Sequence, residues 1–292
     1  KCLSMSFFCS GAYRTIPVCD YKSEQRWIGA CPGCGRFYAI RKYGPDEKLR
    51  SATLADAIEF RPQPRISTGI KAFDEILNGG IVVGSTIVIS GGPGIGKSTL
   101  LMQVANAIAT EKKPVLFASG EQNKEDLLTF AQRLGIQNPH VHIRGNTEIA
   151  QEITDIADDI SPAVVVVDSI QTCVSDDLDA DYGTDTQIKA VANWFTSFGK
   201  KTKTSIVLVC QVNKEGDLAG PKTLEHLCDG TVYFEQYAKT GPLKEARVLI
   251  SGKQRFAPMG EERFLEMTAN GLREPSKDLM KMIEADENEE ED

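Results

Sequence analysis

One ten-residue segment constrains the fold of this chain more than any other. Residues 90–99 read Ser-Gly-Gly-Pro-Gly-Ile-Gly-Lys-Ser-Thr, which satisfies the spacing G-x-x-x-x-G-K-[ST]. A short apolar run at 85–90 precedes the loop, and apolar residues follow at helical spacing over 100–109. A strand, a glycine-rich loop and a helix in this order form a nucleoside triphosphate site. The alternative is a glycine-rich turn with a chance lysine, and it does not explain why spacing and context agree.

Each part of this segment has a role in holding phosphate. The glycines allow backbone N–H groups to turn inward, and the helix N-terminus adds partial positive charge. Lys97 is expected to reach the β- and γ-phosphates of ATP, and Ser98 to hold Mg²⁺. The predicted nucleotide-binding residues are Gly91, Gly92, Pro93, Gly94, Ile95, Gly96, Lys97, Ser98 and Thr99.

Three further candidate catalytic residues follow apolar runs typical of buried strands. Asp168 follows the run at 163–167 and is expected to support Mg²⁺ beside the loop. Glu121 follows a predicted strand at 115–119 and would orient or deprotonate the attacking water, unless it is a solvent-facing loop residue. Gln211 would sense the γ-phosphate and relay its state to the following loop, unless it only caps the strand end.

A pair of cations follows a later predicted strand. Lys253 and Arg255 are separated by one residue, so on an extended segment they face the same way. Both would stabilise charge on a transferring phosphoryl group, including one held by a neighbouring subunit. On spacing alone, an exposed basic turn is the better interpretation.

The chain divides by composition into four parts. Residues 1–40 form a cysteine-rich module, 41–64 a polar linker, 65–274 the ATPase domain and 275–292 an acidic disordered tail. Strands and helices alternate within 65–274. This alternation predicts an α/β fold with a mostly parallel sheet, helices on both faces and an antiparallel extension.

The charge and hydropathy of the chain bear on which partners it binds and in which compartment it works. The net charge of −8 argues against nucleic-acid binding, but residues 1–50 carry nine Lys and Arg against four Asp and Glu. The sequence shows no secretion signal and no run near the roughly 20 apolar residues that a membrane helix needs. We therefore expect a cytoplasmic protein without a membrane partner.

Cysteines are concentrated near the N-terminus. In a reducing compartment, clustered cysteines favour a metal over disulfides, and structural zinc takes four ligands. The Cys31-x-x-Cys34 pair would be joined by Cys9 and Cys19, or by Cys2 in place of one of them. The alternative is a decayed module in which these cysteines only pack.

With these residues assembled, the chain resembles the bacterial RadA/Sms family of RecA-like DNA-repair ATPases. The similarity runs from about Cys19 to Met267, and the segment at 214–226, Lys-Glu-Gly-Asp-Leu-Ala-Gly-Pro-Lys-Thr-Leu-Glu-His, is the hardest to match by chance. The other matching segments are 27–34, 67–74, 79–85, 91–101, 119–121 and 165–172.

The resemblance implies a function and an assembly. It implies a RecA-like core with a small zinc-ribbon-like module, working as a DNA-stimulated ATPase and branch-migration motor. Single-stranded or branched DNA, a RecA-type recombinase and a homo-hexameric ring would be its partners. It also implies that Glu121 is the catalytic carboxylate, and that residues 253–257 correspond to the family signature K-N-R-F-G, with Gln254 and Ala257 as departures.

Two larger departures leave alternatives open. The family usually carries a C-terminal Lon-protease-like domain that this sequence lacks, so we expect either a fragment or a shortened relative. In the zinc module, Lys22 stands near the place of the second cysteine of the first C-x-x-C pair. A second function class therefore remains: a RecA-like, nucleotide-switched signalling or assembly ATPase that does not translocate on DNA.

Overall fold

The computed structural model describes residues 63–175, 178, 181, 183–211 and 224–290, together with the backbone of three short strands nearer the N-terminus. The chain divides into two compact units, Lys1–Pro62 and Gln63–Asp292. In the first unit, β1 (Phe7–Cys9) pairs antiparallel with both β2 (Lys22–Ser23) and β3 (Ile40–Lys42), which gives the order β2-β1-β3.

The predicted zinc site falls on residues that the structure does not describe. Cys2, Cys19, Cys31 and Cys34 lie outside the described residues, and Cys9 is described only as part of the β1 backbone. Within the described part of the chain, no group of three or more His, Cys, Asp or Glu side chains is placed to hold a metal ion. Zinc binding therefore stays a prediction.

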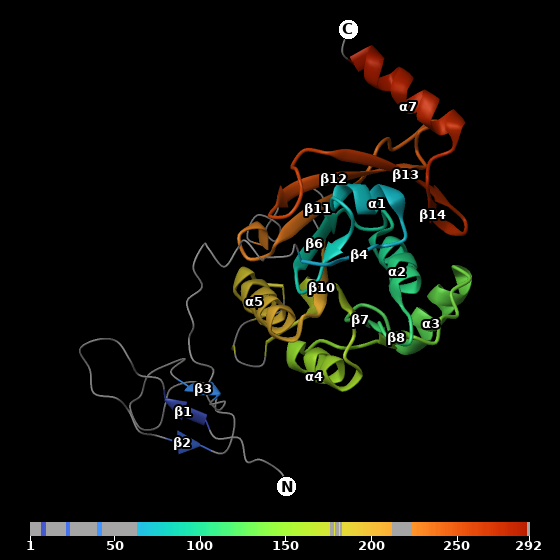
Figure 1. Ribbon diagram of the computed structural model, residues 1–292. Helices are drawn as coiled ribbons and strands as arrows, with labels where there is room; N and C mark the ends of the chain where they lie inside the picture. Colours follow the sequence, from blue (N-terminus) through green and yellow to red (C-terminus); the bar gives the residue numbers. More distant parts are fainter. Residues whose placement is uncertain are drawn as a thin grey trace, which may run out of the picture. The chain divides into compact units, whose positions relative to one another are not determined.

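A nine-stranded sheet organises the second unit (Figure 1). Its strands are β6 (Thr86–Gly91), β7 (Val115–Ser119), β8 (Val141–Arg144), β9 (Val164–Asp168), β10 (Ser205–Gln211), β11 (Gly230–Gln236), β12 (Ala246–Gln254), β13 (Glu262–Thr268) and β14 (Gly271–Arg273). They lie in the order β14-β13-β12-β11-β6-β10-β9-β7-β8. The strands from β11 to β8 are parallel, whereas β12, β13 and β14 add in antiparallel fashion. The predicted mostly parallel sheet with an antiparallel extension is confirmed.

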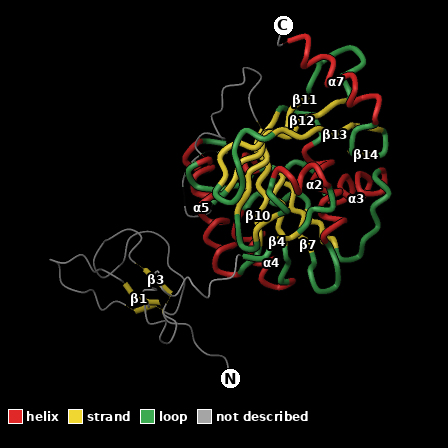
Figure 2. Tube along the Cα trace, turned by 45° about the horizontal axis from the view of Figure 1, so that its top comes forward, coloured by secondary structure: helices red, strands yellow, loops and turns green. Residues whose placement is uncertain are grey.

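Helices cover both faces of this sheet (Figure 2). They are α1 (Lys71–Ile76), α2 (Lys97–Ile108), α3 (Lys124–Arg133), α4 (Ala150–Ile160) and α5 (Asp185–Thr202), and a 3₁₀ turn, η2 (Ile170–Thr172), follows β9. Successive strand side chains point to opposite faces. Ile87 and Ile89 therefore pack in the core under α1, α2 and α3, while Val88 packs in the core under α4 and α5. Strands buried on both faces read as unbroken apolar runs, which is why they were visible in the sequence.

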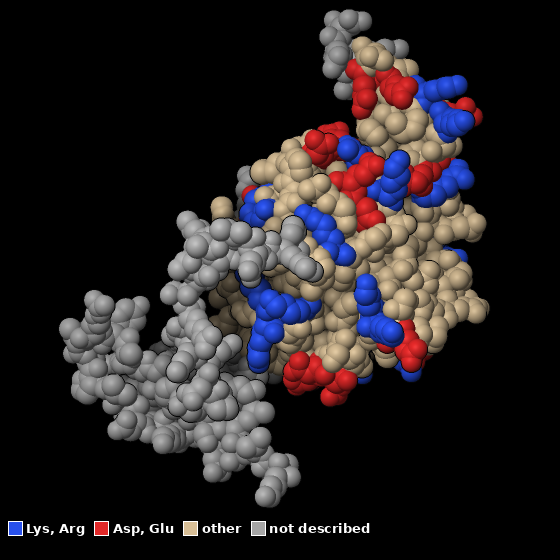
Figure 3. All heavy atoms as spheres, viewed as in Figure 1, with Lys and Arg blue, Asp and Glu red and all other residues tan. Residues whose placement is uncertain are grey.

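The C-terminal segment differs from the predicted disordered tail. Residues Lys277–Glu290 form a helix, α7, whose Leu279 and Ile283 side chains are buried against Leu243 and Ala246. Leu279 and Ile283 are four residues apart, so they share one face of the helix and dock it despite the acidic composition. On the face shown in Figure 3, acidic and basic side chains are interspersed around this helix.

None of the helices in the part of the chain that the structure describes combines the length and the apolar character needed to cross a membrane.

Candidate nucleotide site

The phosphate loop connects the end of β6 to the start of α2, as the motif predicts. Strand β6 ends at Gly91, and α2 begins at Lys97 with Gly96 as its N-cap in the left-handed region, at φ 109°. A Cβ atom on Gly91 would lie 2.1 Å from the Phe234 carbonyl oxygen, and one on Gly96 would lie 2.3 Å from Met267 Cε. Gly91 therefore needs glycine because the β11 backbone packs closely against it, and Gly96 because its φ lies in the region that side chains rarely adopt.

Lys97 is folded into this loop rather than exposed to solvent. Its side chain is buried, and Nζ donates hydrogen bonds to the carbonyl oxygens of Gly91 at 2.8 Å and Gly92 at 2.6 Å. Burial lowers the pKa of Lys97, and the nearby carboxylates of Asp168 and Glu121 oppose that change. The ammonium group thus lies at the loop backbone, where the phosphates of a nucleotide would bind.

Ser98 and Asp168 form a direct pair across the sheet. Ser98 Oγ donates to Asp168 Oδ2 at 2.5 Å, although the two residues come from α2 and from the end of β9. The pKa of Asp168 is raised to about 6, chiefly by burial and also by the charge of Glu121, although the hydrogen bond from Ser98 and the charge of Lys97 lower it. A hydroxyl beside a buried carboxylate at a phosphate loop is a set of oxygen ligands that suits Mg²⁺.

Glu121 and Gln211 meet at the same edge of the sheet. Gln211 Nε2 donates to Glu121 Oε1 at 2.7 Å, so the ends of β10 and β7 are joined through side chains. The register of β7 with β9 sets Ser119 opposite Asp168, which places Glu121 two residues beyond the magnesium candidate. The carboxyl ends of β6, β7, β9 and β10 therefore carry five predicted site residues together: Lys97, Ser98, Glu121, Asp168 and Gln211.

Gln171 also belongs to this cluster and was not singled out from the sequence. Its Nε2 donates to the Gln211 carbonyl oxygen at 2.8 Å and to Cys210 Sγ at 3.2 Å. It lies in η2, directly after the strand that carries Asp168. A glutamine in a turn carries no pattern of its own in the sequence, so only the contact with Gln211 reveals it.

Lys253 and Arg255 lie at the other end of the sheet. Lys253 Nζ donates to the Cys228 carbonyl oxygen at 2.6 Å, and Arg255 Nη1 lies 3.2 Å from Asp229 Oδ1. Asp229 in turn accepts a hydrogen bond from the backbone N–H of Thr86, the first residue of β6. The length of β6, about 17 Å at the usual rise per residue, separates this end from the phosphate loop. Within one chain, the structure does not bring these cations to the predicted nucleotide site.

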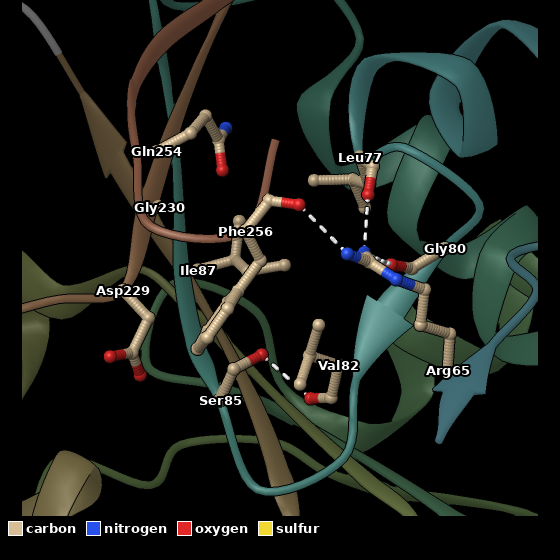
Figure 4. Close-up of a pocket in the computed structure, with 10 residues that line it drawn as sticks. All are labelled: Arg65, Leu77, Gly80, Val82, Ser85, Ile87, Asp229, Gly230, Gln254 and Phe256. Carbon is tan, nitrogen blue, oxygen red and sulfur yellow. Dashed lines mark hydrogen bonds between the residues drawn. The ribbon is translucent and has the colours of Figure 1, made fainter. Parts of the chain in front are cut away.

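The segment after Arg255 is held beside a small pocket, shown in Figure 4. The Arg65 guanidinium donates to the carbonyl oxygens of Leu77 at 2.6 Å, Gly80 at 3.1 Å and Phe256 at 2.8 Å. Arg65 belongs to β4 (Arg65–Ile66), which pairs antiparallel with β5 (Ile81–Val82). Residues on both sides of Arg255 are therefore anchored, Gln254 by the strand and Phe256 by Arg65.

Comparison with known proteins agrees with this arrangement. A family model described as "ATPase: KaiC" matches residues 66–149. The crystal structure of the KaiC-like protein PH0186 from Pyrococcus horikoshii superposes with a TM-score of 0.61 over 74% of this chain and 100% of that chain, at 21% identity, which supports the fold. The fold and the residues at its phosphate loop define the class: a RecA-like P-loop ATPase core.

The sequence relatives narrow this class to one family. The chain is 36% identical over 271 residues to the DNA repair protein RadA of Brucella abortus, a match that covers 87% of this chain and 57% of that relative. The corresponding protein of Bacillus subtilis is 34% identical over 270 residues, with 88% and 58% covered. The chain spans a little more than half the length of these curated relatives. It belongs to the RadA family, as the resemblance predicted.

Proposed function

We propose that this chain hydrolyses ATP and works in DNA repair as a DNA-stimulated motor on single-stranded or branched DNA. The observation that supports the ATPase activity is the convergence of Lys97, Ser98, Asp168 and Glu121 at one edge of the sheet. The DNA substrate is proposed from the names of the relatives, which are DNA repair proteins.

The proposed mechanism assigns each side chain one task. Ser98 and Asp168 would hold Mg²⁺, which in such sites neutralises charge on the β- and γ-phosphates. Lys97 would exchange its hydrogen bonds to the loop carbonyls for bonds to phosphate oxygens. Glu121 would orient the attacking water and accept its proton.

Gln211 is proposed to transmit the state of the site. It contacts Glu121 on one side, and the segment 212–223 follows it directly along the chain. A shift of the Glu121 carboxylate when the γ-phosphate leaves would therefore pull on the start of that segment. This is the proposed route from ATP turnover to the segment that follows Gln211.

The proposal extends to an assembly. Lys253 and Arg255 lie at the end of the sheet opposite the phosphate loop, which is compatible with action on the nucleotide of a neighbouring subunit in a homo-hexameric ring. A RecA-type recombinase is the proposed protein partner.

We also propose one zinc ion held by Cys9, Cys19, Cys31 and Cys34 or, with Cys2 replacing Cys9 or Cys19, by a related set. Metal analysis of protein purified without chelator tests this, and protein free of zinc would contradict it.

The decisive experiment measures ATP turnover by the purified chain with and without single-stranded DNA. DNA is expected to raise the rate. Lys97→Ala should lose turnover and most ATP binding, because its ammonium group lies at the Gly91 and Gly92 carbonyls, where the β- and γ-phosphates would bind. Glu121→Gln should still bind ATP with Mg²⁺ but lose about 10²–10⁴-fold in rate.

Three outcomes would count against the proposal. Near wild-type turnover by Lys97→Ala would contradict the site. Equal loss of ATP binding in both variants would contradict the role of Glu121. Turnover that DNA does not change would instead favour a nucleotide-switched assembly ATPase without translocation.

A further inference from the structure

A buried arginine outside the phosphate-loop motif contacts the loop from the antiparallel extension of the sheet. Arg247, the second residue of β12, is 7% exposed. Its Nε donates to the Ile95 carbonyl oxygen at 3.0 Å, and Nη1 donates to the carbonyl oxygens of Lys244 at 2.9 Å and Ala246 at 3.0 Å. One fork of donors thus ties the phosphate loop to Lys244 in the turn before β12 and to Ala246, the first residue of that strand.

The contact with Ile95 determines the orientation of a peptide group that would otherwise be free to turn. In a trans peptide the carbonyl oxygen and the next N–H point in opposite directions. With the Ile95 oxygen held by Arg247, the Gly96 N–H points away from Arg247. Gly96 is a glycine at φ 109°, so its own backbone imposes little restraint.

The charge of Arg247 is not offset by an ion pair among the described residues. The described ion pairs involve other side chains, and all three hydrogen bonds of Arg247 go to neutral carbonyl groups. Burial lowers the pKa of Arg247, and Glu245, which faces Lys244 in a surface pair, is the acid that opposes this change. A guanidinium remains charged at neutral pH, so a positive charge is buried beside the loop.

We propose that Arg247 is a positioning residue of the nucleotide site, with two connected effects. It holds the Ile95–Gly96 peptide so that the Gly96 N–H faces the phosphates, and its buried charge increases the affinity of the loop for a polyphosphate. A buried cation with only carbonyl partners is costly to a protein, and an anionic ligand nearby reduces that cost. The inference rests on the proposed nucleotide binding.

The test measures binding by isothermal titration calorimetry, with ATP–Mg²⁺ and with inorganic tripolyphosphate–Mg²⁺ as titrants. Arg247→Met keeps the apolar stem and removes the donors and the charge. We expect it to weaken binding of both titrants by about tenfold or more, as the loss of a charge-assisted hydrogen bond does. Arg247→Lys keeps the charge on a single donor group and should lose less than Arg247→Met.

The matched control is Arg263→Met on the neighbouring strand β13. It removes the same charge from an exposed arginine that is paired with Glu75 and Glu261, and ATP affinity should stay within about twofold of wild type. Calorimetry also measures the Kd and the number of binding sites separately, so a change in affinity can be told from a smaller fraction of folded protein. A role in folding alone would lower the number of sites and leave the Kd of the remaining sites unchanged.

The possible failures can be told apart. If wild-type protein binds neither titrant, the proposed function itself fails. If wild type binds both and Arg247→Met retains the wild-type Kd, only the role of Arg247 is overturned. Equal losses in Arg247→Met and Arg247→Lys would overturn the role of its charge, and a loss for ATP without a loss for tripolyphosphate would overturn its action on the phosphates.

Discussion

At the scale of a single residue, the buried carboxylate of Asp168 lowers the stability of the fold and would favour the binding of a cation. The residue is 5% exposed and its carboxyl group accepts a hydrogen bond from the Ser98 hydroxyl, while the charge of Glu121 acts on it as a second acid. Burial and like charge disfavour ionisation, so its pKa rises to about 6. At neutral pH the ionised carboxylate is therefore costly, and a bound cation would relieve that cost.

This cost predicts a pH-dependent gain in stability when the charge is removed. The native pKa of about 6 lies above the ordinary value of 3.8, so the carboxylate destabilises the fold fully above pH 6 and not at all below pH 3.8. The difference corresponds to about 3 kcal/mol. Without metal and nucleotide, Asp168→Asn should be more stable than wild type at pH 7.5 by up to about this amount, and the gain should shrink as the pH falls from 6 to 4.

Urea unfolding at a series of pH values measures the free energy of unfolding and so checks this prediction. The control is Asp159→Asn on the exposed side of α4, which should change that free energy little. An Asp168→Asn protein that is less stable than wild type at pH 7.5 would contradict the assignment. The same variant should lose the stabilisation that ATP with Mg²⁺ gives to wild type.

At the scale of the elements, helix α7 is held in place by a small apolar contact. Only Leu279 and Ile283 are fully buried among its described side chains, and Tyr237 Oη adds a hydrogen bond to Asp286 Oδ2 at 2.9 Å. Most of the helix surface is charged, so its propensity alone would not hold it in place. The stability of α7 therefore rests on its docking against the segment that connects β11 to β12 and against Phe264 of β13.

Shortening one buried side chain should thus release the helix without unfolding the sheet. Ile283→Ala is expected to cost about 2–4 kcal/mol locally, because the cavity cannot be refilled by a helix held at so few points. Hydrogen exchange should show lower protection of the α7 amides, while the amides of β6 and β10 remain protected. The neighbouring variant Met282→Ala alters a side chain that is 37% exposed and should have little effect. Equal loss of protection in both variants would contradict the docked helix.

At the scale of the whole sheet, the proposed nucleotide site and the Lys253–Arg255 pair are separated by the length of the parallel strands. The nucleotide-site residues follow the carboxyl ends of β6, β7, β9 and β10, whereas Lys253 and Arg255 lie beside the first residue of β6. One molecule therefore cannot use its own Arg255 at its own phosphate loop. A ring in which each chain presents this end to the next would unite the two.

Shared sites predict complementation between two inactive variants. Arg255→Ala should reduce ATP turnover severely, by roughly 10³–10⁵-fold if it acts as an arginine supplied in trans, and leave ATP binding nearly intact. Mixing it with Lys97→Ala should restore part of the activity, because some interfaces then combine an intact loop with an intact Arg255. Arg273→Ala removes an exposed arginine paired with Glu266 and serves as the control. Well-mixed rings without recovery, or full activity from a proven monomer, would rule out sharing.

The sequence by itself determined the phosphate loop, the α/β class and the grouping of Lys97, Ser98, Asp168 and Glu121 near one edge. These follow from local patterns, because apolar runs mark buried parallel strands and such strands end at a common edge. Only the tertiary structure decided that Gln211 contacts Glu121, that Arg247 holds a loop carbonyl 152 residues away, and that α7 docks through Leu279 and Ile283. It also decided that Arg255 lies at the far end of β6. The physical reason is the order of strands in the sheet: β6 lies between β10 and β11, and no local periodicity records which distant segments become its neighbours.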